Sequence, residues 1–469
     1  MINQDFDLIV IGSGPGGYTA AIRASQLGFK TAIIEKYNSL GGTCTNVGCI
    51  PAKALLDSSE HYHNAETRFG SFGIQLKDLS IDIDKFFGRK TEVVSQNVAG
   101  INFLMKKNKI TIIYGTARFA SNDKIIVKSA EGTEQEYQSR YTIIATGSKP
   151  ISLPNAVIDK KRIISSTEAL SLNEIPATMS IIGGGVIGVE MASVYARLGT
   201  KVTIIEYAAN LVPTMDREVT TELKKILVKS GIEILLSQRV DAAVSNGKQV
   251  TVKFTGSEGK QQEIITDYCM VAVGRKPYTD GLGLENTNII KDDRGRIVTN
   301  EAFQTSVPNV YAIGDVIKGP MLAHKAEDEA IIAVEGMHGI KHHIDYDRIP
   351  GVVYSWPEVA SVGLTEEQLK ERNIPYNKGK FPFSASGRGR AAGDTSGFAK
   401  VLSDPKYGEV LGVHIIGARA ADLIAQAVTI MEFEVTDSAS STISYAHPTY
   451  AEALKEAFLM ASGRGSLNL

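Results

Sequence analysis

The chain has 469 residues, which is too long for one hydrophobic core and predicts several domains. Hydrophobic residues make up 43% and charged residues 22%, an ordinary globular balance, and the formal net charge is −2. It has no basic tract and no apolar run of membrane-spanning length, so nothing in it points to nucleic acid or a membrane. The first residues enter a strand pattern without a charged-then-apolar presequence, so we expect a cytoplasmic protein.

A strand, a glycine turn and a helix begin the chain. The apolar run Phe6–Ile11 leads into the turn, a helical pattern continues to about Gln26, and the next strand, Lys30–Ile34, ends at Glu35. The glycines of the turn are Gly12, Gly14 and Gly17. This βαβ pattern is typical of dinucleotide binding, because the glycines let the backbone approach a pyrophosphate at a helix N-terminus. Glu35 would accept a hydrogen bond from a ribose hydroxyl.

Two of the three cysteines follow this unit, in the segment GGTCTNVGCIPAK at 41–53. Cys44 and Cys49 are five positions apart, so they can close a small disulfide ring that opens and recloses without dismantling the fold. In a reducing compartment such a disulfide is usually catalytic or redox-sensing. The alternative is half of a zinc site, but such a site needs about four ligands and no second Cys pair or His pair lies nearby.

The glycine pattern of the first unit occurs a second time. Gly183, Gly185 and Gly188 stand 171 positions after the first three glycines, and Glu206 stands 171 positions after Glu35. The flanking strands are expected at Met179–Ile182 and Lys201–Ile205, with a helix to about Leu198 between them. Two dinucleotide units in one chain indicate electron transfer between two dinucleotides.

The position of the cysteines suggests which dinucleotide each unit binds. Exchange between a dithiol and a two-electron hydride carrier needs an intermediary, and a flavin is the usual one. Since the cysteines follow the first unit, we assign FAD to that unit and a nicotinamide to the second. Glu206 favours NAD over NADP, because a carboxylate repels a 2′-phosphate and residues 207–210 include no arginine.

The remaining chain lies between and after these units. Arg140–Thr146 is expected to be a strand that leads into Gly147 and Ser148, and Val307–Asp315 a strand that ends at an acid suited to a flavin's polyol. A plain loop aspartate is the alternative for Asp315. A helix should follow from about Met321 to Gly336, and Cys269, in an apolar strand, should belong to the core.

From about residue 347 the pattern changes to alternating strands, at 401–402 and 410–416, and then a helix over 420–433. The chain is therefore expected to be α/β, with two Rossmann-like dinucleotide-binding domains and an α+β C-terminal domain. We expect the FAD-binding domain at 1–148 and 275–346, the NAD-binding domain at 149–274, and the C-terminal domain at 347–469.

Over essentially its whole length, the chain resembles the pyridine nucleotide–disulfide oxidoreductases, and within them the dihydrolipoamide dehydrogenases. The resemblance rests on the cysteine segment, both glycine turns and the motifs ATGS at 145–148, VGRKP at 273–277, AIGD at 312–315, MLAH at 321–324 and HPTYAEAL at 447–454. Glutathione reductases usually use NADP, mercuric reductases carry an extra C-terminal cysteine pair, and soluble transhydrogenases lack the cysteine pair. The chain departs from the family at Ala451, where a polar residue is frequent, and at 383–390.

The resemblance implies a flavoenzyme that reoxidises the dihydrolipoyl arm of an acyltransferase (E2) or of the glycine-cleavage H-protein, with NAD as the acceptor. It implies a homodimer whose C-terminal domain forms the interface, so that each active site contains residues of both subunits. The alternatives are an NAD(P)H-dependent reductase of another disulfide, such as glutathione or a coenzyme A disulfide, and a flavoprotein subunit without catalytic activity.

The resemblance also assigns catalytic roles. Cys44 would exchange with the substrate and Cys49 would face the flavin, while His447 would act as the general base. Glu452 would orient His447, as a carboxylate bonded to an imidazole does in catalytic triads. The two supporting catalytic residues near the flavin would be Lys53, one helical turn after Cys49, and Glu190.

Further cofactor contacts are implied in the same way. For FAD, they are Gly12, Gly14, Gly17, Glu35, Lys36, Gly42, Thr43, Lys53, Ala117, Thr146, Gly147, Ser148, Asp315, Met321, Leu322, Ala323 and His324. For NAD, they are Gly183, Gly185, Val186, Ile187, Gly188, Glu190, Glu206, Val240 and Gly274. No metal site is expected.

Overall fold

The computed structural model describes residues 5–469, which form two compact units. The first unit contains the chain up to Ala54 together with Asp84–Ile151 and Gly274–Ile344, and the second contains Leu55–Ile83, Ser152–Val273 and Asp345–Leu469. The domain boundaries expected from the sequence stay a prediction. Among residues 5–469, no helix is both long enough and apolar enough to cross a membrane.

The first unit is built on a seven-stranded sheet. Strands β3, β2, β1 and β6 are parallel neighbours, and β17 lies parallel to the end of β6. The first half of β6 runs antiparallel to β5, which pairs in turn with β4. The strands are β1 (Phe6–Ile11), β2 (Thr31–Glu35), β3 (Thr111–Tyr114), β4 (Thr116–Phe119), β5 (Lys124–Lys128), β6 (Glu134–Ile144) and β17 (Val310–Ala312).

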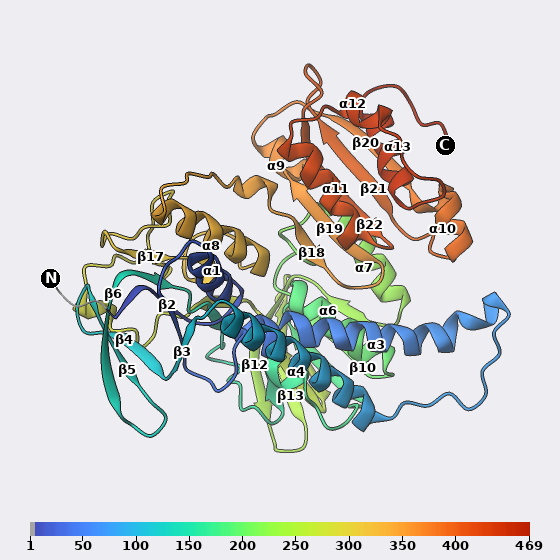
Figure 1. Ribbon diagram of the computed structural model, residues 1–469. Coiled ribbons are helices and arrows are strands. Elements are labelled where there is room, and N and C mark those ends of the chain that lie inside the picture. Colours follow the sequence, from blue (N-terminus) through green and yellow to red (C-terminus); the bar gives the residue numbers. More distant parts are fainter. Residues whose placement is uncertain (1–4) are drawn as a thin grey trace. The chain divides into compact units, whose positions relative to one another are not determined.

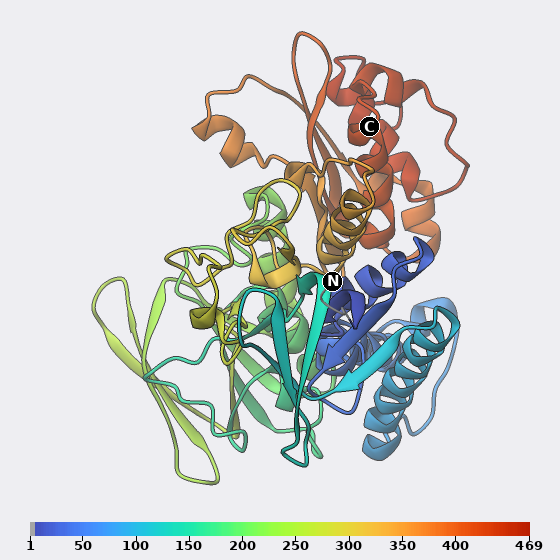
Figure 2. The ribbon, with the colours of Figure 1, turned by 60° about the vertical axis from the view of Figure 1, so that its left-hand side comes forward.

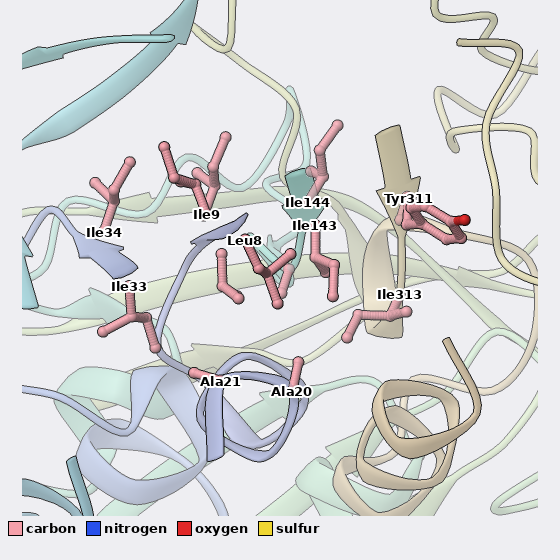
Figure 3. Close-up of a cluster of buried hydrophobic side chains, with 14 of the residues drawn as sticks. Leu8, Ile9, Ala20, Ala21, Ile33, Ile34, Ile143, Ile144, Tyr311 and Ile313 are labelled. Atoms are coloured by element: carbon pink, nitrogen blue, oxygen red, sulfur yellow. The ribbon is translucent and has the colours of Figure 1, made fainter. Parts of the chain in front are cut away.

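Two helices, α1 (Pro15–Gln26) and α8 (Ala323–Met337), lie side by side in this unit (Figures 1 and 2). A Cβ atom built on Gly16 of α1 would lie 3.0 Å from the carbonyl oxygen of Ala326, so a larger residue there would push α8 away by a few tenths of an ångström. The strand side chains alternate between the two faces of the sheet. Leu8, Ile33 and Ile143 point towards α1, and Ile9, Ile34 and Ile144 point to the opposite face (Figure 3).

Outside this sheet, further elements carry the two cysteines and Ser148 of the ATGS motif. These elements are α2 (Gly42–Val47), α3 (Cys49–Thr67), α4 (Ile83–Lys107) and the antiparallel pair β7 (Ser148–Pro150) and β16 (Arg275–Pro277). Helix α3 starts in the first unit and ends in the second. The strand expected at Val307–Asp315 covers only Val310–Ala312. A turn closed by the Val310 N–H and the Val307 carbonyl precedes it, and Gly314, with a φ of +74°, begins a 3₁₀ turn after it.

The second unit contains a five-stranded parallel sheet in the order β11-β10-β9-β15-β8. Its strands and helices are β8 (Ile163–Ile164), α5 (Ser166–Ala169), β9 (Thr178–Ile182), α6 (Val186–Arg197), β10 (Lys201–Ile205), α7 (Arg217–Lys229), β11 (Glu233–Leu235) and β15 (Tyr268–Val271). Cys269 is fully buried in β15, which confirms the core position expected, and burial raises the pKa of its thiol to about 12.

An antiparallel sheet of three strands follows in the same unit, drawn in yellow-green in Figure 2. Its strands are β12 (Gln238–Ser245), β13 (Val250–Gly256) and β14 (Gln261–Thr266).

The C-terminal part of this unit is an antiparallel sheet in the order β18-β19-β22-β21-β20. Helix α11 lies against β19 and β22, and α13 lies against β20 and β21. The elements are β18 (Gly351–Val353), β19 (Glu358–Gly363), α9 (Glu366–Glu371), β20 (Asn377–Pro382), α10 (Gly387–Ala392), β21 (Phe398–Ser403), β22 (Val410–Gly417), α11 (Ala420–Glu432), α12 (Asp437–Thr442) and α13 (Ala451–Ala461). Sheet and helices together make the expected α+β region.

Candidate active site

The two glycine turns have the same geometry in their respective units. Gly12 has a φ of +104° and Gly183 a φ of +110°, a left-handed conformation that only glycine adopts at little cost. A Cβ on Gly17 would lie 1.9 Å from the Gly12 carbonyl oxygen, and a Cβ on Gly188 would lie 2.0 Å from that of Gly183. The sequence repeat is therefore a structural repeat, in which the helix starts directly against the turn.

The carboxylates at the ends of the second strands, Glu35 and Glu206, accept equivalent backbone hydrogen bonds. Glu35 accepts from the backbone N–H groups of Ser13, at 3.1 Å, and Tyr37, at 3.0 Å. Glu206 accepts from Gly184, at 2.5 Å, and from the N–H two residues after itself, at 2.6 Å. Each acid thus holds its own glycine turn, and a carboxylate has room for further donors such as ribose hydroxyls.

The cysteine segment lies against the first glycine turn. A Cβ on Gly42 would be only 2.6 Å from the Cα of Gly14, so this backbone contact needs glycine. Cys44 lies on α2 and is half-buried, whereas Cys49 is the first residue of α3 and is exposed. Both side chains are thiols in this structure.

Cys44 is a poor acid in this dithiol form. The hydrogen bond between the two thiols raises its pKa most, burial raises it further, and the charges of Cys49 and Glu327 add to the effect. A protonated thiol is a poor nucleophile, because the thiolate is the reactive species. Cys44 would therefore need a base wherever it must act as the attacking thiolate.

Tyr18 and Glu327 lie close to the cysteines, and the sequence did not single them out. The Tyr18 hydroxyl donates to Glu327 at 2.9 Å. Burial raises the pKa of Tyr18 well above its usual value, with contributions from Glu327, Cys44 and Cys49. Tyr18 directly follows Gly17 and Glu327 lies three residues after His324, so only their positions beside known motifs could have suggested them.

Asp315 lies in a chain of polar contacts at the end of the central strands. The Ser148 hydroxyl donates to Asp315 at 2.5 Å, and Arg275 donates to both the hydroxyl and the carbonyl of Ser148, at 2.7 and 2.8 Å. Burial lowers the pKa of Arg275, although Asp315 opposes that shift. Arg275 was not among the expected site residues, but it stands in the VGRKP motif.

Most other residues predicted for the FAD site also lie in the first unit. The Lys36 ammonium lies 4.0 Å from the centre of the Tyr278 ring, and the Thr146 hydroxyl donates to the carbonyl of the same tyrosine at 2.7 Å. Ala117 is buried on β4, and Lys53 is half-buried on α3. Gly147 precedes β7, Thr43 lies on α2, and the segment from Met321 to His324 leads into α8.

The residues predicted for the NAD site divide between the two units. Val186, Ile187 and Glu190 lie on α6, behind Gly185, and Val240 lies on β12. Glu190 is buried and accepts from the backbone N–H of Tyr354 at 3.0 Å. Gly274 belongs to the first unit and accepts from the N–H of Ile151 at 3.0 Å.

His447 and Glu452 form a pair at the start of α13. The Nδ1 atom of His447 lies 2.9 Å from Glu452 Oε1, while Oε2 accepts from the Thr449 N–H at 2.9 Å. Burial raises the pKa of Glu452, but its bonds to His447 and Thr449 outweigh burial and hold the pKa below its usual value. Since an ionised carboxylate only accepts, Nδ1 carries the proton, and the Nε2 of a neutral ring has the free lone pair of a base. The His447 side chain is 78% exposed, so a second molecule can reach it.

Two dinucleotide-type turns and a dithiol beside one of them are the parts of a dinucleotide-dependent dithiol–disulfide oxidoreductase. A family model described as pyridine nucleotide-disulphide oxidoreductase matches residues 6–330, and the dimerisation domain of that family matches residues 349–458. The chain belongs to the pyridine nucleotide-disulphide oxidoreductase family. As a member, it is an FAD-dependent oxidoreductase that uses NAD.

Similar proteins are found over almost the whole chain. It is 46% identical over 456 residues to the mitochondrial dihydrolipoyl dehydrogenase of Pisum sativum, covering 97% of this chain and 91% of that protein. It is 45% identical over 469 residues to the mitochondrial dihydrolipoyl dehydrogenase of Homo sapiens, covering 99% and 92%. Among solved structures, the Cu(II) complex of the HOCl-induced flavoprotein disulfide reductase RclA from Escherichia coli has a TM-score of 0.87 and 30% identity, covering 97% and 99%.

The residues of the first unit fit FAD. A Cβ on Gly14 would meet nothing within 4 Å, so the turn is open where a pyrophosphate would lie at the N-terminus of α1. Glu35 would hold the adenosine ribose, and Asp315 would bind the polyol. Gly185 is open in the same way in the second unit, where Glu206 would hold the ribose of NAD. When bound, FAD supplies two-electron transfer between the dithiol and NAD.

Glu206 leads to a prediction about nicotinamide choice. We expect kcat/KM with NAD to exceed that with NADP by at least roughly a hundredfold, about 3 kcal/mol of discrimination. The reason is that the Glu206 carboxylate repels a 2′-phosphate, and Tyr207, Ala208, Ala209 and Asn210 offer no cation in its place. Steady-state rates with each nucleotide at fixed dithiol measure the ratio. Comparable values for the two nucleotides would mean that another residue decides this preference.

Proposed function

We propose that this protein is a dihydrolipoyl dehydrogenase, which oxidises a protein-bound dihydrolipoyl group and reduces NAD. The structural observation that carries the proposal is the close approach of Gly42 to Gly14, which holds the start of the segment with Cys44 and Cys49 against the turn that fits FAD. The identity to relatives with this name, 46% and 45%, supports it over the alternative of another disulfide substrate.

The exchange needs two steps at the Cys44–Cys49 disulfide. One substrate thiolate attacks the sulfur of Cys44, which forms a mixed disulfide and releases Cys49 as a thiolate. The second substrate thiolate attacks the lipoyl sulfur of that mixed disulfide, which closes the lipoyl ring and releases Cys44. The enzyme has then gained two electrons, and each substrate thiol has lost a proton.

In our proposal His447 takes these protons one at a time, and it releases the first to solvent before the second substrate thiol reacts. Its Nε2 atom has the lone pair, and Glu452 stabilises the imidazolium that forms. We infer that His447 of the partner subunit serves Cys44, because His447 lies within the segment 349–458 that matches the family's dimerisation domain. That match supports a homodimer.

We further propose an acyltransferase (E2) or a glycine-cleavage H-protein as the lipoyl-bearing partner. A lipoyl group on a mobile arm would reach an exposed base such as His447, with the cysteine pair beside it in the assembled dimer. The proposal places the enzyme in the cytoplasm, although the Pisum sativum and Homo sapiens relatives are named as mitochondrial. Co-purification with the lipoyl-bearing protein and cell fractionation test these two points.

The substrate assay tests the proposed function. FAD-loaded protein with NAD should oxidise dihydrolipoamide with a kcat/KM at least roughly a hundredfold above that for reduced glutathione or reduced coenzyme A. The second thiol of dihydrolipoamide is in the same molecule, so resolution of the mixed disulfide is intramolecular and far faster. Similar or higher values with a monothiol would favour a reductase of that disulfide instead, and no turnover with any thiol would favour a subunit without catalytic activity.

A further inference from the structure

A buried ion cluster lies in the second unit, outside the site described above. The Lys400 ammonium on β21 is 3.0 Å from both carboxylate oxygens of Asp216. It also lies 2.6 Å from Glu366 and 2.9 Å from Glu218. The Lys400 side chain is 1% exposed and that of Asp216 is fully buried. Burial lowers the pKa of Lys400, but the carboxylates outweigh it and the net pKa is raised, so the lysine stays charged.

Asp216 is the last residue of the loop that follows Glu206. It is the N-cap of α7, where its carboxylate accepts from the Glu218 N–H at 3.1 Å, and it also accepts from the Glu366 N–H at 3.1 Å. Lys400 is the only cation bonded to this carboxylate in the part of the chain that the structure describes. The cluster therefore fixes the end of the loop to the C-terminal sheet.

The middle of the same loop lies against the second glycine turn. Val212 donates its N–H to the Gly184 carbonyl at 2.9 Å, and Leu211 is buried, with Cδ2 only 2.6 Å from where a Cβ on Gly184 would lie. Val212 has a φ of +42°, which is strained for a β-branched residue. Such a conformation persists only where the surrounding contacts hold it, and it is common at ligand sites.

We propose that Lys400 is a positioning residue for NAD, acting through Asp216 on the loop that shapes the Gly184 turn. Without the ammonium, the buried Asp216 carboxylate would lose its hydrogen-bonded counter-ion and keep only the nearby His414, whose own pKa is lowered by burial. That arrangement is costly and moves the carboxylate towards water. Leu211 and Val212, a few residues earlier on the same loop, would then lose their fixed position on Gly184. The inference rests on the proposed function only in taking residues 183–188 as the NAD site.

ADP-ribose is the probe, because it has the adenosine and pyrophosphate of NAD but no nicotinamide ring and cannot accept a hydride. In calorimetric titrations of the FAD-loaded dimer, Lys400→Met should raise its Kd roughly tenfold or more, since a misplacement of about 1 Å can cost up to about a hundredfold. The kcat/KM for NAD should fall in parallel, while that for dihydrolipoamide should change much less. If the wild type fails to oxidise dihydrolipoamide, the proposed function fails, but the ADP-ribose result still stands.

Two variants distinguish positioning from a general loss of structure. Lys380→Met removes a 2.7 Å bond to Glu218 at the rim of the cluster without touching Asp216, and should leave the Kd for ADP-ribose unchanged. The double variant Asp216→Asn with Lys400→Met keeps a good N-cap and leaves no unpaired charge at position 216, so its Kd should return towards that of the wild type.

An unchanged Kd in folded Lys400→Met would overturn the proposal, as would an equal rise in Lys380→Met. If Lys400→Met does not fold, Leu211→Ala replaces it as the test, because it leaves the ion cluster intact. That variant should also raise the Kd for ADP-ribose about tenfold, and an unchanged value would overturn the role of the loop.

Discussion

Replacing His447 with glutamine should slow dihydrolipoamide oxidation by at least roughly a hundredfold, the scale of losing a general base. The substrate thiols are mostly protonated near neutral pH, and only a thiolate attacks the Cys44–Cys49 disulfide. Glutamine keeps the approximate size of the side chain but cannot take a proton. Stopped-flow mixing of the oxidised, FAD-loaded enzyme with dihydrolipoamide measures the affected half-reaction.

The other half-reaction is the internal control for this variant. Reduction of the bound flavin by NADH uses no substrate thiol, so it should stay within a few-fold of the wild type. His343→Gln is the matched control, because His343 is exposed and has no proposed role, and it should oxidise dihydrolipoamide normally. Equal losses in both half-reactions of His447→Gln would mean that His447 supports the structure rather than the dithiol chemistry.

Replacing either Cys44 or Cys49 with serine should abolish dithiol oxidation, by at least about a thousandfold, because a serine hydroxyl cannot form or exchange a disulfide. Each variant should still bind FAD, since the turn that fits it lies at Gly12–Gly17 and is unchanged. Cys269→Ser is the matched control, because that cysteine is buried in the core, and it should keep the activity for as long as it folds. Substantial turnover in Cys44→Ser or Cys49→Ser would rule out a disulfide relay through this pair.

The two inactive variants can also be combined to test the shared site. If His447 serves Cys44 of the partner subunit, co-refolding His447→Gln with Cys44→Ser makes hybrid dimers with one complete site. By chance pairing about half of the dimers are hybrids with one of two sites intact, so the mixture should recover about a quarter of wild-type activity. Verified hybrids that remain inactive would mean that His447 acts within its own chain.

The sequence predicted the local parts of the fold well, because they depend on near neighbours. The glycine spacing and the apolar runs placed β1, α1 and β2, and their counterparts β9, α6 and β10, within about one or two residues of where they lie. The short strand β17 was predicted too long, since the pattern at 307–315 does not show that a turn precedes Val310 and that Gly314 begins another after the strand.

The contacts that position the site were not predictable in the same way. Lys400 and Asp216 are 184 positions apart, and Ser148 and Asp315 are 167 positions apart, so only the tertiary fold brings them together. The hydrogen bonds that Glu35 and Glu206 accept from the backbone of their own glycine turns were also missed, because the motif predicts only a contact with a ribose hydroxyl. The roles of Cys44, Cys49, His447 and Glu452 stay predictions.

The most direct measurement counts the free thiols of the oxidised enzyme before and after dihydrolipoamide is added, and again after NAD is added. Trypsin releases Tyr37–Lys53, which carries Cys44 and Cys49, and separately Gln261–Arg275, which carries Cys269. Oxidised, FAD-loaded enzyme is treated anaerobically with one equivalent of dihydrolipoamide, quenched under denaturing conditions with a thiol-alkylating reagent and analysed by mass spectrometry.

Peptide 37–53 should be unlabelled at first, doubly labelled after dihydrolipoamide, and unlabelled again once NAD is added. Cys269 takes no part in the reaction, so it should be labelled in every sample. In the FAD-free protein, dihydrolipoamide should still allow both labels on peptide 37–53, but NAD should not remove them. If the peptide stays unlabelled after dihydrolipoamide, or if NAD does not reverse the labelling in the FAD-loaded enzyme, electrons do not pass from substrate to NAD through Cys44 and Cys49.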